Sequence, residues 1–214
     1  PPIAKRWAGR RVVVAAPGPS LTPGVAEQCR NHTVFAIKEA YRLLPWAEVV
    51  YGCDGKFWDR LDPSGVPYGL SPSITGERWS SHGGEGIDNK QAWARKYCLK
   101  LVYGKSASHF SLEQTHINYG NNSGFQAINL VLLFGATDLV LVGFDMKTNG
   151  KGDPYFFGQH ITRTVVPYDK FAPIFAAAAR RLPKNIRIIN ATPGSALRCW
   201  PIMPLEEALN ADAA

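Results

Sequence analysis

The sequence predicts an α/β fold, namely a Rossmann-like, doubly wound and mostly parallel sheet. Three observations lead to this prediction. Short runs rich in valine and isoleucine alternate with segments that suit helices, which is the pattern of strand–helix–strand units. These runs are apolar throughout, as expected of parallel strands buried on both faces. No repeat or low-complexity linker divides the 214 residues, so we expect a single nucleotide-binding domain over 1–214.

The first half of the chain has the order βαβαβ. A first strand over 11–16 ends abruptly in the turn Pro17-Gly18-Pro19-Ser20. The elements expected after it are a helix around 23–30, a strand over 32–37, one or two helical turns over 39–44 and a strand over 47–52. Right-handed crossovers between such strands produce a parallel sheet.

The middle of the chain has weak periodicity. Residues 59–90 are rich in Pro, Gly and Ser and form too long a stretch for an ordinary connection. We therefore expect an irregular insertion or a lid within 59–118, with one short strand inside 96–103.

The pattern becomes clear again from Ser123 onwards. A strongly apolar helix is expected over 124–134, with Gly135 ending it. Beyond it we expect a buried strand over 138–143, a helix over 168–182 and a last strand over 186–190. The second half therefore continues the alternation of strands and helices.

Composition excludes several classes of protein. The chain is 45% hydrophobic and 19% charged, which is typical of a globular domain. It has no apolar run near the roughly 20 residues that cross a bilayer, and its start lacks a signal-peptide core, so we expect a cytoplasmic protein without a membrane span. The four cysteines are scattered, which predicts neither a zinc site nor a disulfide framework. The net charge of +7 leaves a nucleic-acid partner open, and nothing predicts the oligomeric state.

Polar and small residues follow the strand ends or precede a helix. The carboxyl ends of parallel strands share one edge of a sheet, and ligands bind in the crevice beside that edge. A glycine there lets the backbone approach a ligand, and helix-start amides attract phosphate. Such residues also serve as simple helix caps. The residues expected to bind a nucleotide are Gly18, Pro19, Ser20, Lys38, Asp54, Asn122, Ser123, Gly124 and Asp145.

His160 is the candidate general base. It lies in a glycine-containing stretch after the 138–143 strand, and a neutral imidazole there could take a proton from a hydroxyl group. An ordinary loop histidine is the alternative. The sequence contains no Gly-x-Gly-x-x-Gly motif, and Leu99 stands where a P-loop ending in Gly104-Lys105-Ser106 would need glycine. No metal-binding motif is present, so no metal ligand is predicted.

Four short segments carry a resemblance to two related families: Gly18–Leu21, Asn122–Gly124 with its helix, Leu141–Met146 and Ile188–Leu197. They resemble the bacterial family 42 sialyltransferases and the 6-hydroxymethylpterin diphosphokinase-like proteins, which include phage members. The resemblance implies a nucleotide phosphate at the Gly18 and Ser123 loops and a base at His160. It departs at Lys38, where the sialyltransferases have an asparagine that holds the nucleotide.

The leading hypothesis is a nucleotide-dependent transferase, specifically a glycosyltransferase with a nucleotide-sugar donor and no obligatory cofactor. Lys38 would neutralise the leaving phosphate, Asp54 and Asp145 would orient sugar or ribose hydroxyls, and His160 would deprotonate the acceptor. The protein could be phage-encoded and act on DNA in the host cytoplasm. The alternatives are a diphosphokinase dependent on Mg²⁺ and ATP, and a non-catalytic module that binds DNA or a phage assembly partner.

Overall fold

The computed structural model describes residues 2–61, 74–81, 90–160 and 165–211. Its strands are β1 (Arg11–Ala15), β2 (Thr33–Ile37), β3 (Val49–Tyr51), β4 (Glu77–Ser81), β5 (Leu99–Val102), β6 (Gly104–Lys105), β7 (Ile117–Asn118), β8 (Asp138–Val142) and β9 (Arg187–Asn190). Its helices are α1 (Pro23–Gln28), the 3₁₀ helix η1 (Lys38–Arg42), α2 (Gly55–Asp59), α3 (Lys90–Lys96), α4 (Ser123–Leu133), α5 (Tyr168–Ala179) and α6 (Leu205–Asn210).

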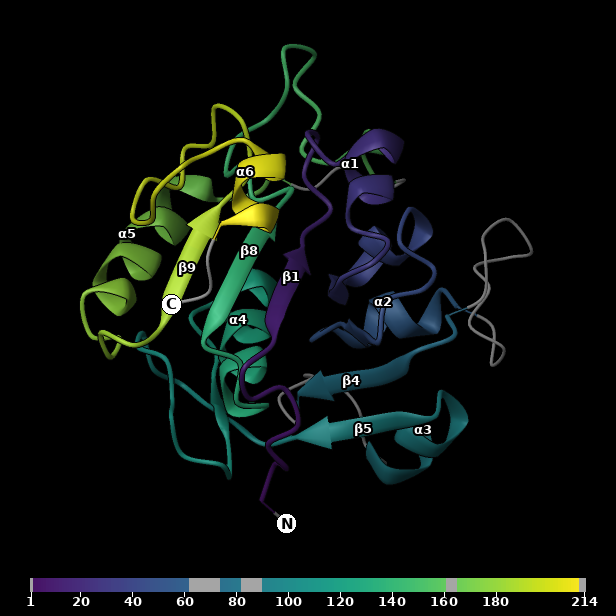
Figure 1. Ribbon diagram of the computed structural model, residues 1–214. Helices are drawn as coiled ribbons and strands as arrows, with labels where there is room; N and C mark the ends of the chain where they lie inside the picture. Colours follow the sequence, from purple (N-terminus) through teal and green to yellow (C-terminus); the bar gives the residue numbers. More distant parts are fainter. Residues whose placement is uncertain (1, 62–73, 82–89, 161–164, 212–214) are drawn as a thin grey trace.

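Seven of these strands form one sheet in the order β5-β4-β3-β2-β1-β8-β9, and every pair in it is parallel (Figure 1). The predicted Rossmann-like α/β class is therefore confirmed. The short strands β6 and β7 pair separately, also in parallel.

Helices cover both faces of the sheet, which makes the fold doubly wound. Side chains alternate between the two faces along a strand. In β1, Val12 and Val14 join the core that contains the apolar side of α4 and part of α5. Val13 and Ala15 join a second core with residues of α1, α2 and α6. All four of these residues are fully buried, which explains why the strand is apolar from Val12 to Ala15.

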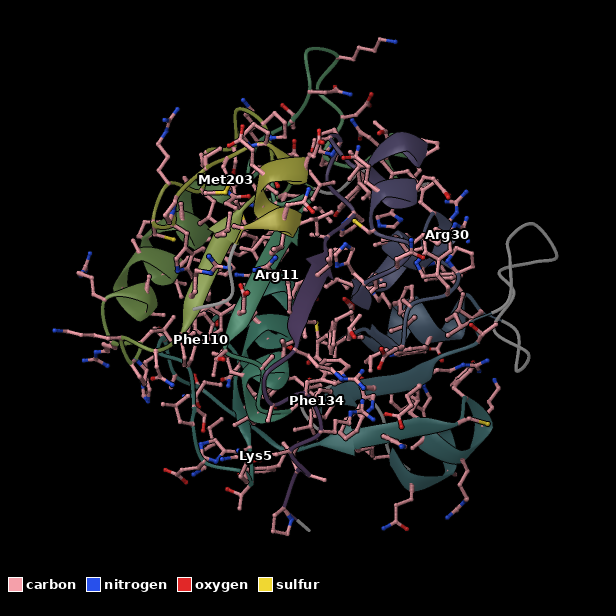
Figure 2. All side chains as sticks on the ribbon, in the orientation of Figure 1. Lys5, Arg11, Arg30, Phe110, Phe134 and Met203 are labelled. Carbon is pink, nitrogen blue, oxygen red and sulfur yellow. The ribbon has the colours of Figure 1, made fainter. Side chains whose placement is uncertain are left out.

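An aromatic cluster closes the first core at the amino edge of the sheet. Phe134, labelled in Figure 2, follows α4 and packs edge-on against Trp7 and Trp79, with ring centroids 4.9 and 5.2 Å apart. The backbone amide of Trp7 also donates to the carbonyl of Phe134. The segment before β1 is thereby fixed to the end of α4.

Part of the region 59–118 belongs to the sheet. β4 pairs with β3, and β5 pairs with β4 as the edge strand, so these segments extend the core. Residues 62–73 and 82–89 lie outside the described part of the chain, and a lid in this region stays a prediction. In the second half, α5 ends at Ala179, three residues before the predicted end, with Arg180 at the C-cap position.

The order in which strands are added to the sheet reverses at β1. From β1 the chain moves outward through β2 to β5, and it returns with β8 on the other side of β1. The helices α1 and α5, which come after β1 and β8, therefore pack on opposite faces of the sheet. Open parallel sheets bind ligands at the carboxyl edge beside such a reversal point. Among the described residues, no helix is long and apolar enough to cross a bilayer.

Candidate functional site

A cavity of about 360 Å³ opens at this carboxyl edge. Its walls come from the segments after β1, β2, β3 and β8, and from the starts of α4 and α5. The predicted residues that line it are Gly18, Lys38, Asp54, Asn122, Ser123, Gly124, Asp145 and His160. The fold thus brings together residues that lie up to 142 positions apart in the sequence.

The loop after β1 is held to the loop after β8. The Gly18 amide donates to the Gly143 carbonyl at 3.1 Å, and Ser20 Oγ donates to Asp145 Oδ2 at 2.8 Å. A Cβ at Gly18 would overlap both the Gly143 carbonyl and the Asp145 carboxylate. Burial raises the pKa of Asp145, although the hydrogen bonds from Ser20 oppose this shift. Gly18 is therefore needed for packing within the protein. Ser20 does not line the cavity, but its hydrogen bond holds the lining residue Asp145 in position.

The start of α4 forms another wall of the cavity. Asn122 is the N-cap, and its Oδ1 accepts the Phe125 amide at 2.8 Å. The amides of Ser123 and Gly124 lie in the first turn, where helical amides have no partner within the helix. They carry the positive end of the helix dipole. This end of the cavity is suited to a phosphate group or another anion.

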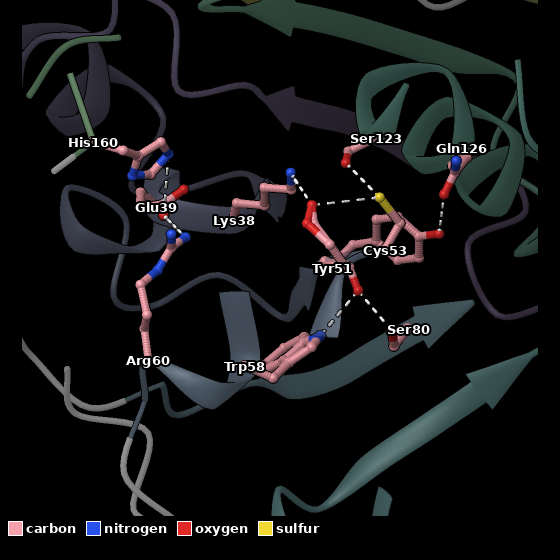
Figure 3. A network of polar contacts seen from close by, with 12 residues as sticks. Lys38, Glu39, Tyr51, Cys53, Trp58, Arg60, Ser80, Ser123, Gln126 and His160 are labelled. Carbon is pink, nitrogen blue, oxygen red and sulfur yellow. Dashed lines mark hydrogen bonds and ion pairs between the residues drawn. The ribbon is translucent and has the colours of Figure 1, made fainter. Parts of the chain in front are cut away.

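Lys38 and Asp54 form an ion pair on the third wall (Figure 3). Lys38 has φ +47°, an unusual left-handed backbone for a lysine, directly after β2. Burial by itself would lower the pKa of Lys38, but the neighbouring Cys53, Asp54 and Glu39 groups outweigh it and raise that pKa. Lys38 therefore stays charged, and a bound phosphate would share it with Asp54.

Cys53 lies between the ion pair and α4. Its Sγ is 2.9 Å from Ser123 Oγ and 3.8 Å from Asp54 Oδ2. Burial raises the pKa of the Cys53 thiol, against the opposing effect of Lys38, so the group is neutral at pH 7. Its thiol therefore links β3 to the first turn of α4 as a polar contact.

His160 lies at the other end of the cavity, beside an acidic and a basic side chain. Its Nε2 is 3.8 Å from Glu39 Oε1, which also accepts from Arg60 Nη2 at 2.9 Å (Figure 3). The rings of Tyr155 and Phe157 stack on each other, and each lies about 5 Å from the imidazole. Burial lowers the pKa of His160, and Glu39 partly opposes that effect. The imidazole is therefore neutral at pH 7 and able to accept a proton.

The wall on the α5 side is mostly apolar. Val166, Pro167, Tyr168 and Phe171 line it, together with Val165, which is 89% exposed. The Tyr168 hydroxyl donates to the Pro154 carbonyl at 3.2 Å. The Phe156 amide donates to the Pro17 carbonyl at 3.1 Å, which fastens the segment before His160 to the loop after β1.

The structure adds residues that sequence reasoning missed. Glu39 and Cys53 are adjacent to the predicted Lys38 and Asp54, and both could have been found by the same rule about strand ends. Tyr155 and Tyr168 come from loop and helix-start positions that carry no sequence signal. Pro19 and Ser20 do not line the cavity, since the loop turns away after Gly18. Within the described residues, no three His, Cys, Asp or Glu side chains are grouped as a metal site.

Comparison with known proteins supports the fold. No protein-family model matches the sequence, and no curated protein matches it. A solved structure of the MAf glycosyltransferase from Magnetospirillum magneticum AMB-1 is similar, with a TM-score of 0.66 at 13% identity. The match covers 99% of this chain and 36% of that protein, so this chain spans about a third of its length. The likeness shows a glycosyltransferase-like Rossmann-type fold, while the predicted resemblance to the two families stays a prediction.

Proposed function

We propose that the chain is a nucleotide-dependent transferase, specifically a glycosyltransferase with a nucleotide-sugar donor. The observation that carries the proposal is one cavity with two chemically different ends. At one end, a helix start and Lys38 suit an anion, and at the other a half-buried, neutral histidine faces the same space. The cavity lies at the reversal point of a sheet that resembles that of a glycosyltransferase.

The donor phosphate would bind at the first turn of α4. The amides of Ser123 and Gly124 and the Lys38 ammonium would carry its charge. Gly18 would shape the floor, and the hydrogen bond from Ser20 to Asp145 would hold its loop in place. Asp54 would then orient a sugar or ribose hydroxyl as well as pair with Lys38.

The acceptor would bind at the His160 end. The acceptor hydroxyl gives its proton to the imidazole, and its oxygen forms a bond to the anomeric carbon of the sugar. At the same time the bond from that carbon to the phosphate oxygen breaks, and its electron pair leaves with the nucleotide. The positive charge at the phosphate end stabilises this leaving group.

Two finer proposals concern the substrates. The first is that the nucleotide phosphate binds at the loops of Gly18–Leu21 and Asn122–Gly124, which resemble those of family 42 sialyltransferases and diphosphokinase-like proteins. The net charge of +7 suits a polyanionic acceptor, and DNA in a phage-infected cell is one such acceptor. Salt-sensitive DNA binding by the purified chain would support the second proposal.

A nucleotide panel in a thermal-shift assay tests the function. CMP, UDP, GDP, ADP and ATP are each added with Mg²⁺ or with EDTA. We expect one nucleotide to raise the melting temperature by about 5 °C at 100 times its Kd, whether or not metal is present. Lys38→Gln should abolish the shift, while Lys56→Gln, an exposed lysine in α2, should keep it.

The other outcomes of the panel identify the alternatives. A shift only with ATP and Mg²⁺ would instead support diphosphate transfer. No shift with any nucleotide would contradict the proposed function. In that case DNA binding that ignores nucleotides would point to the binding module.

A further inference from the structure

Glu39 is a buried carboxylate with only one of its oxygens satisfied. The residue is 8% exposed, and its Oε1 accepts from Arg60 Nη2 at 2.9 Å. Its Oε2 is buried and has no hydrogen-bond partner among the described residues. Burying a carboxylate is costly unless both oxygens are paired. A purely structural ion pair with Arg60 therefore leaves half of this group unexplained.

The same carboxylate lies beside His160, through the oxygen that also binds Arg60. The two side chains come from different elements, since Glu39 belongs to η1 and His160 follows the β8 loop. Their closest atoms, Oε1 and Nε2, are 3.8 Å apart, slightly beyond hydrogen-bond range. Hydrogen bonds of catalytic groups are often long before substrate binds and shorten in the complex. Shortening this distance by about half an ångström would bring the two groups within hydrogen-bond range.

We propose that Glu39 is the positioning residue for His160. Its carboxylate holds the Nε2–H of the imidazole, so that Nδ1 faces the acceptor hydroxyl, and it stabilises the imidazolium formed when Nδ1 takes the proton. This inference rests on the proposed function, because it needs His160 to act as the base. The proton stays on Nδ1 until it passes to solvent after the product has formed.

Several charged groups act on His160 from the surrounding elements. Glu39 and Asp54 are acidic and favour the imidazolium, whereas Arg60 and Lys38 oppose it. The rings of Tyr155 and Phe157 exclude water from the same side chain. Of the two acidic groups, Glu39 has the larger effect on the imidazole. Removing its charge should therefore lower the pKa of His160 further, and removing Arg60 should raise it.

The test measures the effect of Glu39 and Arg60 on the pKa of His160 directly, without relying on activity. The imidazole signal of His160 is followed by NMR against pH in the wild type, in Glu39→Gln and in Arg60→Gln, and is assigned with His160→Gln. We expect the pKa of His160 to fall in Glu39→Gln and to rise in Arg60→Gln. The opposite directions keep the test decisive even if one variant does not fold. Glu113→Gln is the matched control, because Glu113 faces His116 at 3.7 Å outside the cavity.

Transferase kinetics then show whether Glu39 positions His160 for catalysis or only lies near it. In Glu39→Gln, we expect kcat to fall about tenfold or more, with the KM for the donor within about twofold of the wild type. The acidic limb of the pH–rate profile should move with the pKa of His160. Glu39→Asp should recover part of the loss.

Three results would overturn the inference, each in a different way. An unchanged His160 titration in both variants would make Glu39 a structural partner of Arg60. A shifted titration with an unmoved pH–rate profile would show that His160 is not the base. Absence of nucleotide binding in the wild type, with the titration still coupled, would overturn the proposed function and the catalytic role together while leaving the contact itself established.

Discussion

His160 is the residue whose removal separates chemistry from binding. Under the proposed mechanism, His160→Ala removes the base but leaves the phosphate end of the cavity intact. We expect kcat to fall by about 10²-fold or more, with the Kd for the donor nucleotide within about twofold. Steady-state kinetics and isothermal titration calorimetry measure the two effects. Equal turnover in the variant would remove His160 from the mechanism.

The pH dependence of the same residue has a definite sign. Burial lowers the pKa of His160 from its usual 6.5, and a general base works only when neutral. Activity should therefore be constant above that pKa and fall as the pH drops through it. The midpoint of this acidic limb should lie below 6.5 in the wild type.

Gly18 has a packing role that its sequence context did not indicate. The sequence suggested that a glycine there lets the backbone approach a ligand, and in the structure a Cβ at this position would overlap the Gly143 carbonyl and the Asp145 carboxylate. We expect Gly18→Ala to lower the free energy of unfolding by about 1–3 kcal/mol, because the backbone must shift. Gly150→Ala, where a methyl group meets no atom within 4 Å, should change it by less than about 0.5 kcal/mol. Urea denaturation compares them, and equal effects would contradict the packing role.

At the scale of single elements, α1 and α4 begin with comparable side-chain caps but differ in what their first turns face. Thr22 Oγ1 accepts the Val25 amide at 3.2 Å, and Asn122 Oδ1 accepts the Phe125 amide at 2.8 Å. We expect Thr22→Ala and Asn122→Ala each to cost about 1 kcal/mol of stability. Only Asn122→Ala should also weaken nucleotide binding, by about fivefold, because α4 lines the cavity.

Denaturation and nucleotide titration of both variants check this expectation. A similar loss of nucleotide binding in Thr22→Ala would show that the effect is general destabilisation. Unchanged binding in Asn122→Ala would remove the start of α4 from the proposed phosphate site.

The elements that sequence reasoning predicted are those with a strong local pattern. The strands β1, β2, β8 and β9 are apolar runs, and α4 is an apolar helix followed by Gly135 with φ +93°. β4 was missed because Glu77-Arg-Trp-Ser-Ser81 is largely polar, and only its last two residues are buried. Its place in the sheet comes from pairing with β3 and β5, which are distant in sequence.

Over the whole molecule, the topology explains why much of the cavity was predictable. Parallel strands put their carboxyl ends at one edge, so residues that follow them converge without knowledge of the contacts. Lys38, Asp54, Asp145 and the start of α4 were found in this way. The contacts among these side chains could not be predicted from the sequence. The ion pairs of Lys38 with Asp54 and of Glu39 with Arg60 depend on how η1 and α2 pack in the folded protein.

Both ends of the described chain are attached at the edge of the sheet opposite the cavity. Trp7 is bonded to Phe134 after the end of α4, and Arg11, the first residue of β1, donates to the carbonyls of Leu209 and Ala211. A tag or a biosensor surface joined at either end would therefore leave the cavity facing the solution. The protein can be immobilised through either attachment point, and agreement between the two would show that tethering has not distorted the measured affinity.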